Sequence, residues 1–257
     1  MTFPAYLHLG SLVVHPHWIF ESLAYTAGFS LYRRLRRQRG DVIDSRARWW
    51  VITAAIIGGL AGSRILSVFE DPLVLVDHWM QPQLLLGGKT IVGGLVGGLI
   101  AVESVKRLRG IRVATGDLLA LPLVLGIAIG RIGCFLSGFD DQSYGIGTTL
   151  PWGVDFGDGI PRHPTQLYEV VVLAGLGAML MSRPGRTAPA GDRFKLFMVV
   201  YLGFRLLVEF IKPRFSYVFD LSLIQLACVA GLCYYYRVIL FPKKLILSPS
   251  PAPFLHG

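Results

Sequence analysis

Ionisable side chains inside long apolar segments are the residues of this 257-residue chain whose type and position could do chemistry. Arg131 lies in the apolar stretch that contains GRIG, and Arg205 and Glu209 lie four residues apart in FRLLVEF. A spacing of four places Arg205 and Glu209 on one face of a helix. Because a charge in the interior of a bilayer costs several kcal/mol, each of these side chains needs a partner or a polar cavity. Other apolar segments hold Glu21, Arg64, Glu103 and Glu169.

Two interpretations of these charges remain open. In the first, they form internal ion pairs, such as Arg205 with Glu209, that only stabilise helix packing. In the second, Arg131 and Arg205 face one cavity, where two guanidinium groups would repel each other unless an anion joined them. A guanidinium presents its N–H donors in a fork that matches phosphate oxygens. In a bilayer the available phosphate is a phospholipid headgroup, so the second interpretation favours a phospholipid-binding site.

The composition indicates the kind of scaffold that positions these side chains. The chain is 53% hydrophobic and 16% charged, against roughly 25% charged for a soluble domain. A helix that crosses the ~30 Å hydrocarbon layer needs about 20 apolar residues. We therefore predict an all-α polytopic membrane protein of about seven transmembrane helices, at Val14–Tyr32, Trp49–Phe69, Thr90–Val105, Asp117–Leu136, Leu167–Met181, Phe194–Ile211 and Leu221–Leu240.

Basic residues gather in every second connection between these segments. The first, third and fifth connections and the C-terminal end hold most of the 25 Lys and Arg residues. Cytoplasmic loops accumulate positive charge, so we predict an N-terminus outside and a C-terminus in the cytoplasm. The first residues lack the features of a cleavable signal peptide, and the first membrane helix is expected to direct targeting. The other connections hold only Lys89, Arg162, Lys212 and Arg214.

The chain is predicted to form one transmembrane domain over residues 1–245, followed by a disordered tail at 246–257. An outside loop at about 138–165 contains Trp152 and Phe156, which favour an ordered structure on the membrane surface. Glycine pairs in the second and third segments predict close helix packing, or the wall of a lipid cavity. They are Gly58, Gly59, Gly62, Gly93, Gly94, Gly97 and Gly98.

Several function classes are not supported by the residue pattern. The net charge of +9 could suggest a nucleic-acid binder, but the basic residues lie in short runs without an aromatic platform for bases. Cys134, Cys228 and Cys233 lie in apolar segments, where a thiol acts as a small hydrophobe. A nucleophilic role for Cys134 is the less favoured alternative. No Cys/His spacing is typical of a zinc site, so neither a metal nor a cofactor is expected.

Several motifs resemble those of the bacterial prolipoprotein diacylglyceryl transferases. They are GRIGCFLSG, the PWGV…RHPTQLYE run, FRLLVEF and GGKTIVGGLVGG, and they follow the family's order from about His15 to about Tyr235. The resemblance implies transfer of the diacylglyceryl group of phosphatidylglycerol to the lipobox cysteine thiol of a preprolipoprotein. Its partners would be phosphatidylglycerol, the preprolipoprotein signal peptide and the lipid bilayer, at the bacterial cytoplasmic (inner) membrane. Glycerol phosphate would leave.

The resemblance also implies roles for particular residues. It assigns Arg131 and Gly145 to the headgroup, and it makes Arg205 essential, with Glu209 beside it. On the outer face, His163 is the candidate base for the thiol, although its alternative role is to cap the following helix in a turn. Lys89 could bring a third cation to the headgroup, or it could extend its ammonium into external water.

Two departures from the family pattern bear on activity. Cys134 replaces the asparagine of the usual GRxGN motif, and Val92 replaces a histidine that enters the third helix. Loss of that histidine removes a proposed thiol-activating base. A non-catalytic or differently specific phospholipid-binding protein therefore remains an alternative, as does a lipid transporter.

Overall fold

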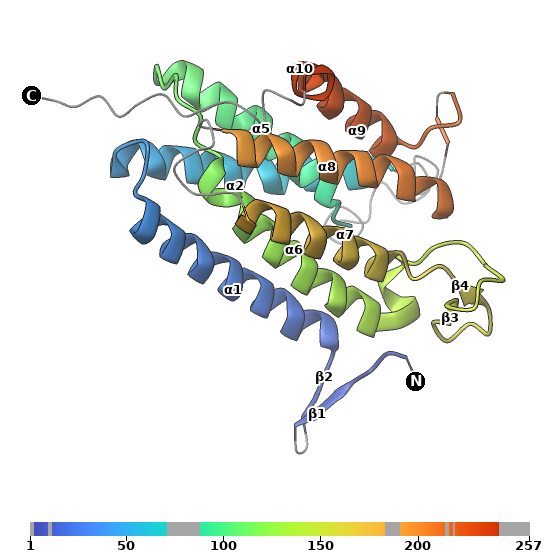
Figure 1. The fold of residues 1–257 in the computed structure, drawn as a ribbon. Helices are drawn as coiled ribbons and strands as arrows, with labels where there is room; N and C mark the ends of the chain where they lie inside the picture. The colour runs from blue at the N-terminus through green and yellow to red at the C-terminus, as the bar shows by residue number, and fades with distance from the viewer. Residues whose placement is uncertain are drawn as a thin grey trace, which may run out of the picture. The chain divides into compact units, whose positions relative to one another are not determined.

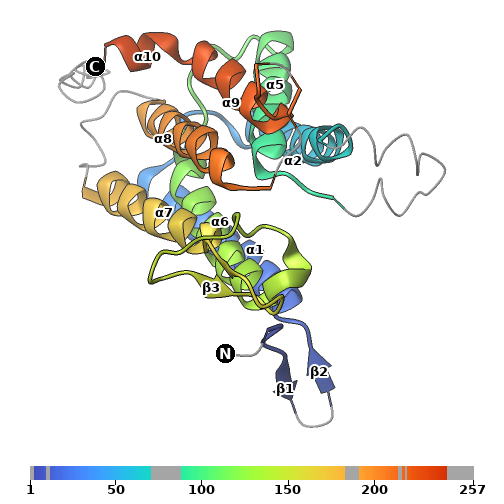
Figure 2. The same cartoon turned by 90° about the vertical axis from the view of Figure 1, so that its right-hand side faces the viewer.

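A computed structural model of the chain describes residues 3–9, 12–70, 88–182, 191–213, 216–217 and 219–241. Most of these residues are helical (Figures 1 and 2). The chain divides into two compact units. The first comprises Met1–Gly40, Gly116–Tyr201 and Arg237–Gly257, and the second comprises Asp41–Thr115 and Leu202–Tyr236.

The first unit is built on α1 (Pro16–Arg39), α6 (Asp117–Ser137) and α7 (Thr165–Ser182). Helix α6 packs along α1 and also against α7 (Figures 1 and 2). Proline is favoured at the first position of a helix, and Pro16 opens α1 while the His15 side chain accepts a hydrogen bond from the His17 amide at 3.3 Å. Before α1, β1 (Leu7–Leu9) and β2 (Leu12–Val14) form an antiparallel hairpin.

The loop between α6 and α7 is ordered and has a small aromatic core. It contains the 3-10 turn η1 (Gly138–Asp141) and the antiparallel strands β3 (Val154–Asp155) and β4 (Pro161–Arg162). Phe156 is fully buried, and its ring lies 5.4 Å from that of Phe3 and 5.8 Å from those of Phe135 and Tyr144. Buried aromatic rings therefore hold this loop against the end of α6, whereas its predicted place outside the membrane stays a prediction.

The second unit contains α2 (Ser45–Val68), α5 (Ile91–Leu108), η2 (Glu209–Ile211) and α9 (Leu223–Tyr234). The division between units falls inside α8 (Asp192–Val208) and again within α10 (Tyr236–Leu240). Short polar side chains cap the helix starts, because the first backbone N–H groups of a helix have no acceptor within the helix. Asp44 accepts from Ala47 N at 3.0 Å, and Thr90 accepts from Gly93 N at 3.2 Å. Ser222 and Gln225 form a capping box on α9.

Helices α2 and α5 pack backbone to backbone through their glycines, as the sequence predicts. A Cβ added to Gly62 would lie 2.4 Å from the Gly93 carbonyl oxygen and 2.8 Å from Gly97 Cα. A Cβ added to Gly97 would lie 2.3 Å from the Gly58 carbonyl oxygen. Because backbone atoms cannot move aside as a flexible side chain can, the two helices approach this closely only with glycine at the crossing.

We expect Gly62→Ala to lower the free energy of unfolding by about 1–3 kcal/mol, because the added methyl forces the packed helices apart. Gly59→Ala is the matched control, since the described atom nearest to its Cβ would be the Gly94 carbonyl oxygen, at an ordinary 3.5 Å. Denaturant titration of both variants in the same detergent compares them. Equal stability of the two variants would contradict this account of the crossing.

Every segment that we predicted as a helix contains one, although some bounds differ. Helix α1 continues from the predicted end at Tyr32 to Arg39, with basic residues in its last turn, where they complement the helix dipole. It ends before Gly40, whose φ of 75° suits glycine. The predicted last helix divides into α9 and α10. The predicted tail at 246–257 lies outside the described residues.

Within the described part of the chain, three helical spans are long and apolar enough to cross a membrane. They are Ser45–Val68, Asp117–Asp141 and Thr165–Ser182. The chain is therefore a mostly helical protein with membrane-spanning character. The predicted total of seven crossings and the single-domain organisation remain predictions.

Candidate functional site

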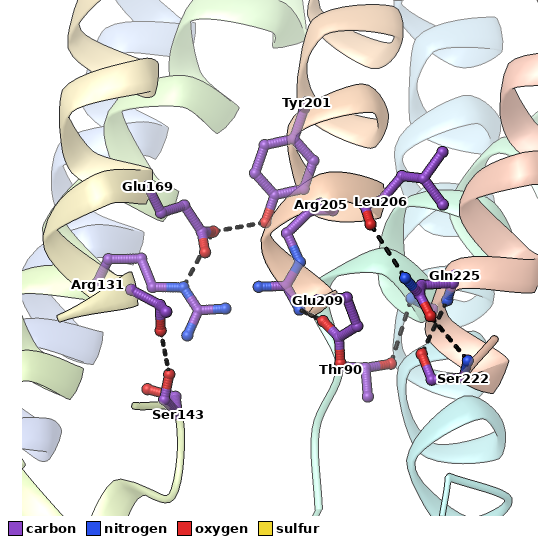
Figure 3. A network of polar contacts seen from close by, with 12 residues as sticks. Thr90, Arg131, Ser143, Glu169, Tyr201, Arg205, Leu206, Glu209, Ser222 and Gln225 are labelled. Carbon is purple, nitrogen blue, oxygen red and sulfur yellow. Dashed lines mark hydrogen bonds and ion pairs between the residues drawn. The ribbon is translucent and has the colours of Figure 1, made fainter. Parts of the chain in front are cut away.

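Arg131 is held by an ion pair with a buried carboxylate from the neighbouring helix. Its Nε lies 3.0 Å from Oε1 of Glu169, whose side chain is only 2% exposed. The hydroxyl of Tyr201, from α8, donates to the same carboxylate oxygen at 2.7 Å. Figure 3 shows the Glu169 carboxylate between Arg131 and Tyr201. The arrangement fixes the guanidinium from two neighbouring helices and balances its charge.

The position of Glu169 follows from the way α7 begins. The Thr165 hydroxyl donates to the Ser143 carbonyl at 2.6 Å, which ties the first residue of α7 to the preceding loop. Glu169 then follows one helical turn into α7 and reaches Arg131 on α6. The sequence placed Glu169 among the intramembrane charges, but it did not predict this partnership.

The outer part of the Arg131 guanidinium keeps donors for another ligand. Glu169 engages Nε, whereas Nη1 contacts Sγ of Cys134 at 3.8 Å. A thiol sulfur is a weak acceptor, and a guanidinium carries five N–H donors in all. Among the described residues, Glu169 is the carboxylate that pairs with Arg131. The site can therefore present a charged fork to an oxyanion such as phosphate.

Arg205 and Glu209 form the ion pair that their spacing predicts. Nη2 of Arg205 lies 3.0 Å from Oε2 of Glu209, and the side chains are 6% and 1% exposed (Figure 3). Nearby, the Gln225 side-chain amide donates to the Leu206 carbonyl at 3.2 Å, which joins the end of α8 to the start of α9. This hydrogen bond lies within the second unit, as the ion pair does.

The predicted meeting of the two arginines in one cavity remains a prediction, because Arg131 belongs to the first unit and Arg205 to the second. The same is true of Lys89, which lies in the second unit just before α5 and has an exposed side chain. Its predicted reach toward the Arg131 headgroup site is therefore also untested.

His163 and Gly145 lie in two segments of the ordered loop that are joined by backbone hydrogen bonds. The Gly145 amide donates to the His163 carbonyl at 2.9 Å, and the His163 amide donates to the Ile146 carbonyl at 3.1 Å. Nδ1 of His163 lies 3.1 Å from the Tyr168 hydroxyl, which also accepts from Nε1 of Trp152 at 2.9 Å. The Tyr168 oxygen can accept a second hydrogen bond, from Nδ1 of His163. In the tautomer that carries its hydrogen on Nδ1, the lone pair of Nε2 is available as a base.

An ion pair joins strand β4 to the turn between β3 and β4. Arg162 donates from Nε to Oδ2 of Asp158 at 2.8 Å, and its Nη2 lies 2.6 Å from the same oxygen. The hydrogen bond from Arg162 lowers the pKa of the Asp158 carboxyl below its usual value of 3.8. The Arg162 guanidinium also lies over the Tyr144 ring, 5.0 Å from its centre. The pair therefore links the hairpin to the aromatic core of the loop.

This pair predicts that the loop loosens in acid. A carboxyl with a lowered folded-state pKa stabilises the structure above its unfolded pKa, and this contribution is lost as the pH falls through the folded value. Protection is the intrinsic exchange rate of an amide at a given pH divided by its observed rate. We expect the protection of the backbone amides of residues 154–162 to fall below about pH 3.8. Asp158→Asn should show the lower protection already at neutral pH and no such acid step, whereas Asp140→Asn should behave like the original protein. An identical acid step in Asp158→Asn would contradict the assignment.

Three possible metal ligands also meet in the first unit. His17 from α1, Cys134 from α6 and Asp141 from η1 place one ligand atom each within 4.8 Å of one another. The sequence did not predict this group, because its members come from three elements and share no local spacing. It adjoins Arg131 through the contact with Cys134.

Comparison with known proteins identifies what the chain is similar to. A family model described as prolipoprotein diacylglyceryl transferase matches residues 4–241. A phosphatidylglycerol–prolipoprotein diacylglyceryl transferase of Geobacter sulfurreducens is 32% identical over 95% of this chain and 92% of its own length. Relatives of the same name from Cupriavidus metallidurans and Nitratidesulfovibrio vulgaris are 34% and 35% identical, over 81% and 83% of this chain and 80% and 83% of their own lengths.

Proposed function

The chain belongs to the prolipoprotein diacylglyceryl transferase family, and we propose that it transfers the diacylglyceryl group of phosphatidylglycerol to a prolipoprotein cysteine. The observation that carries this proposal is Arg131, whose guanidinium is held by Glu169, itself bonded to Tyr201, while among the described residues its Nη1 contacts the sulfur of Cys134. Such a group suits the phosphate of the lipid donor.

The reaction requires little covalent chemistry from the protein. The cysteine sulfur of the acceptor forms a thioether bond to the glycerol carbon of the diacylglyceryl group. The bond between that carbon and the phosphate oxygen breaks, and glycerol phosphate leaves with the electron pair. Arg131 offsets the charge that develops on the leaving phosphate, and the protein otherwise positions two substrates. Glu169 and Tyr201 are positioning residues, since they act through Arg131.

We assign the second buried arginine to the same reaction. Arg205 would contribute a second cation to the phosphate, with Glu209 holding its guanidinium at 3.0 Å. Lys89 would add a third cation by binding phosphate as an ammonium.

His163 is our candidate base for the thiol, and Gly145 lies in the loop segment that is hydrogen-bonded to it. Removal of the thiol proton by Nε2 requires the hydrogen on Nδ1, where the Tyr168 oxygen can accept it. Because the Gly145 amide donates to the His163 carbonyl, a shift of the Gly145 segment would move His163. Gly145 would also let the headgroup approach the backbone closely.

We further propose seven membrane crossings in the bacterial inner membrane, with the N-terminus outside. The alternation of basic residues between connections supports this topology. A reporter that is active only in the cytoplasm should be active when inserted after Arg39. A reporter that is active only outside the cytoplasm should be active when inserted near Gly145. The opposite pattern would reverse the face of the membrane on which the loop at 138–165 lies, and it would overturn the proposed location of the reaction.

Complementation tests the proposed activity directly. The full chain, expressed in a bacterium depleted of its own transferase, should restore the mass increase of a reporter lipoprotein by one diacylglyceryl group. A chain that reaches the membrane in normal amount and binds phosphatidylglycerol, but yields no modified lipoprotein, would favour the non-catalytic alternative. Movement of labelled lipid across vesicles without modification would favour a transporter.

A further inference from the structure

His17, Cys134 and Asp141 have a chemistry and a separation that suit a transition-metal ion. Their ligand atoms lie within 4.8 Å of one another, and Nδ1 of His17 is 3.7 Å from Oδ1 of Asp141. Ligands on one zinc ion bind at about 2.0–2.3 Å from it. An ion between the three side chains would therefore draw them together through small side-chain movements. All three side chains are partly buried, which limits competition from water.

The three donors differ in type, and this narrows the choice of ion. A thiolate sulfur, an imidazole nitrogen and a carboxylate oxygen together favour Zn²⁺ and its close relatives over Mg²⁺ or Ca²⁺, which prefer oxygen alone. Three protein ligands leave the fourth tetrahedral position to a water molecule or another oxygen ligand.

Further residues orient two of the ligands in the manner of established metal sites. Nε2 of His17 lies 3.6 Å from Oε2 of Glu21, so Nδ1 can bind a metal while Nε2–H faces a carboxylate. Glu21 itself accepts from the Tyr25 hydroxyl at 3.2 Å. The Ser143 hydroxyl donates to Oδ2 of Asp141, which leaves Oδ1 toward His17. Outer partners of this kind fix the ring and the carboxylate of metal ligands.

The balance of charge also favours a cation at this position. Arg131 contacts Cys134, but its charge is already balanced by Glu169. The Cys134 thiol would lose its proton on binding a metal, so a divalent ion would meet two negatively charged ligands, Cys134 and Asp141, and the imidazole of His17. The two charges of such an ion match those of the thiolate and the carboxylate.

We propose that His17, Cys134 and Asp141 form a site for one divalent transition-metal ion, with Glu21 as the residue that orients His17. The bound ion would join α1, α6 and η1 at a single point beside Arg131. Binding of the metal does not depend on the proposed transferase function, because it follows from the ligand group alone.

Cobalt binding tests the site, because thiolate-bound Co²⁺ has a near-ultraviolet charge-transfer band that nitrogen and oxygen ligands do not produce. The full chain, purified in detergent without a histidine tag and treated with a chelator, should take up one equivalent of Co²⁺ with this band. Zn²⁺ should displace it. Cys134→Ser should abolish the band, whereas Cys228→Ser and Cys233→Ser should retain it.

The remaining variants separate ligands from a nonspecific surface site. His17→Ala and Asp141→Asn should each weaken Co²⁺ binding by at least tenfold, and Glu21→Gln should weaken it by about 10–100-fold while keeping the band. Each variant must elute as a single species on size exclusion, and Asp141→Asn preserves the shape of its side chain. Absence of the band in the original protein, or its survival in Cys134→Ser, would overturn the proposal.

Discussion

Arg131→Lys is expected to lower the rate of diacylglyceryl transfer by about 100- to 1,000-fold, as loss of a donor to a developing oxyanion does in other enzymes. Lysine keeps the positive charge but lacks the planar fork that engages two phosphate oxygens together. It also cannot use Nε to hold Glu169 at 3.0 Å while its outer nitrogens contact a substrate. The rate is measured in membranes with labelled phosphatidylglycerol and a prolipoprotein acceptor.

The matched control for this substitution is Arg109→Lys. Arg109 follows the end of α5, where its guanidinium lies 4.0 Å from the centre of the Trp50 ring. The substitution of Arg109 should leave the rate of transfer unchanged. Tyr201→Phe removes the hydrogen bond to Glu169 without altering Arg131, so it should give a smaller loss. Transfer by Arg131→Lys above half of the original rate, at equal protein level, would exclude the proposed phosphate contact.

The features that could be predicted from the sequence are those that depend on short spacing. Arg205 and Glu209 pair because four residues span one helical turn, and that pair is present. The glycines of α2 and α5 predict close packing because each lacks a side chain, and their backbones meet in the structure. Such contacts depend on local periodicity or on residue size, which a single sequence displays directly.

The features that could not be predicted join residues that are distant in the sequence. Glu169 reaches Arg131 only because the loop at 138–165 folds back and starts α7 beside α6. The metal-ligand group has the same origin, since His17, Cys134 and Asp141 share no spacing. The sequence displays such residues as separate charges or a lone thiol, and their partners emerge only from helix packing.

Breaking the Arg205–Glu209 pair should destabilise the protein strongly, whereas removing both charges should not. Arg205→Leu leaves the Glu209 carboxylate, which is 1% exposed, without its guanidinium. Loss of one partner of a buried ion pair costs about 3–5 kcal/mol, since the remaining charge stays out of water. We expect this loss in both Arg205→Leu and Glu209→Leu. The double variant should lie closer to the original protein, because an apolar pair replaces the ions.

Activity in the same three variants separates a structural role of Arg205 from a role in transfer. If Arg205 contacts the phosphate, the double variant should remain inactive although its stability is largely restored. Denaturant titration in detergent gives the free energies of unfolding, and the lipoprotein assay gives the rates. An active double variant would make the pair purely structural and remove Arg205 from the reaction. Additive destabilisation by the two substitutions would instead show that each side chain stabilises the protein through other contacts, because coupled partners deviate from additivity.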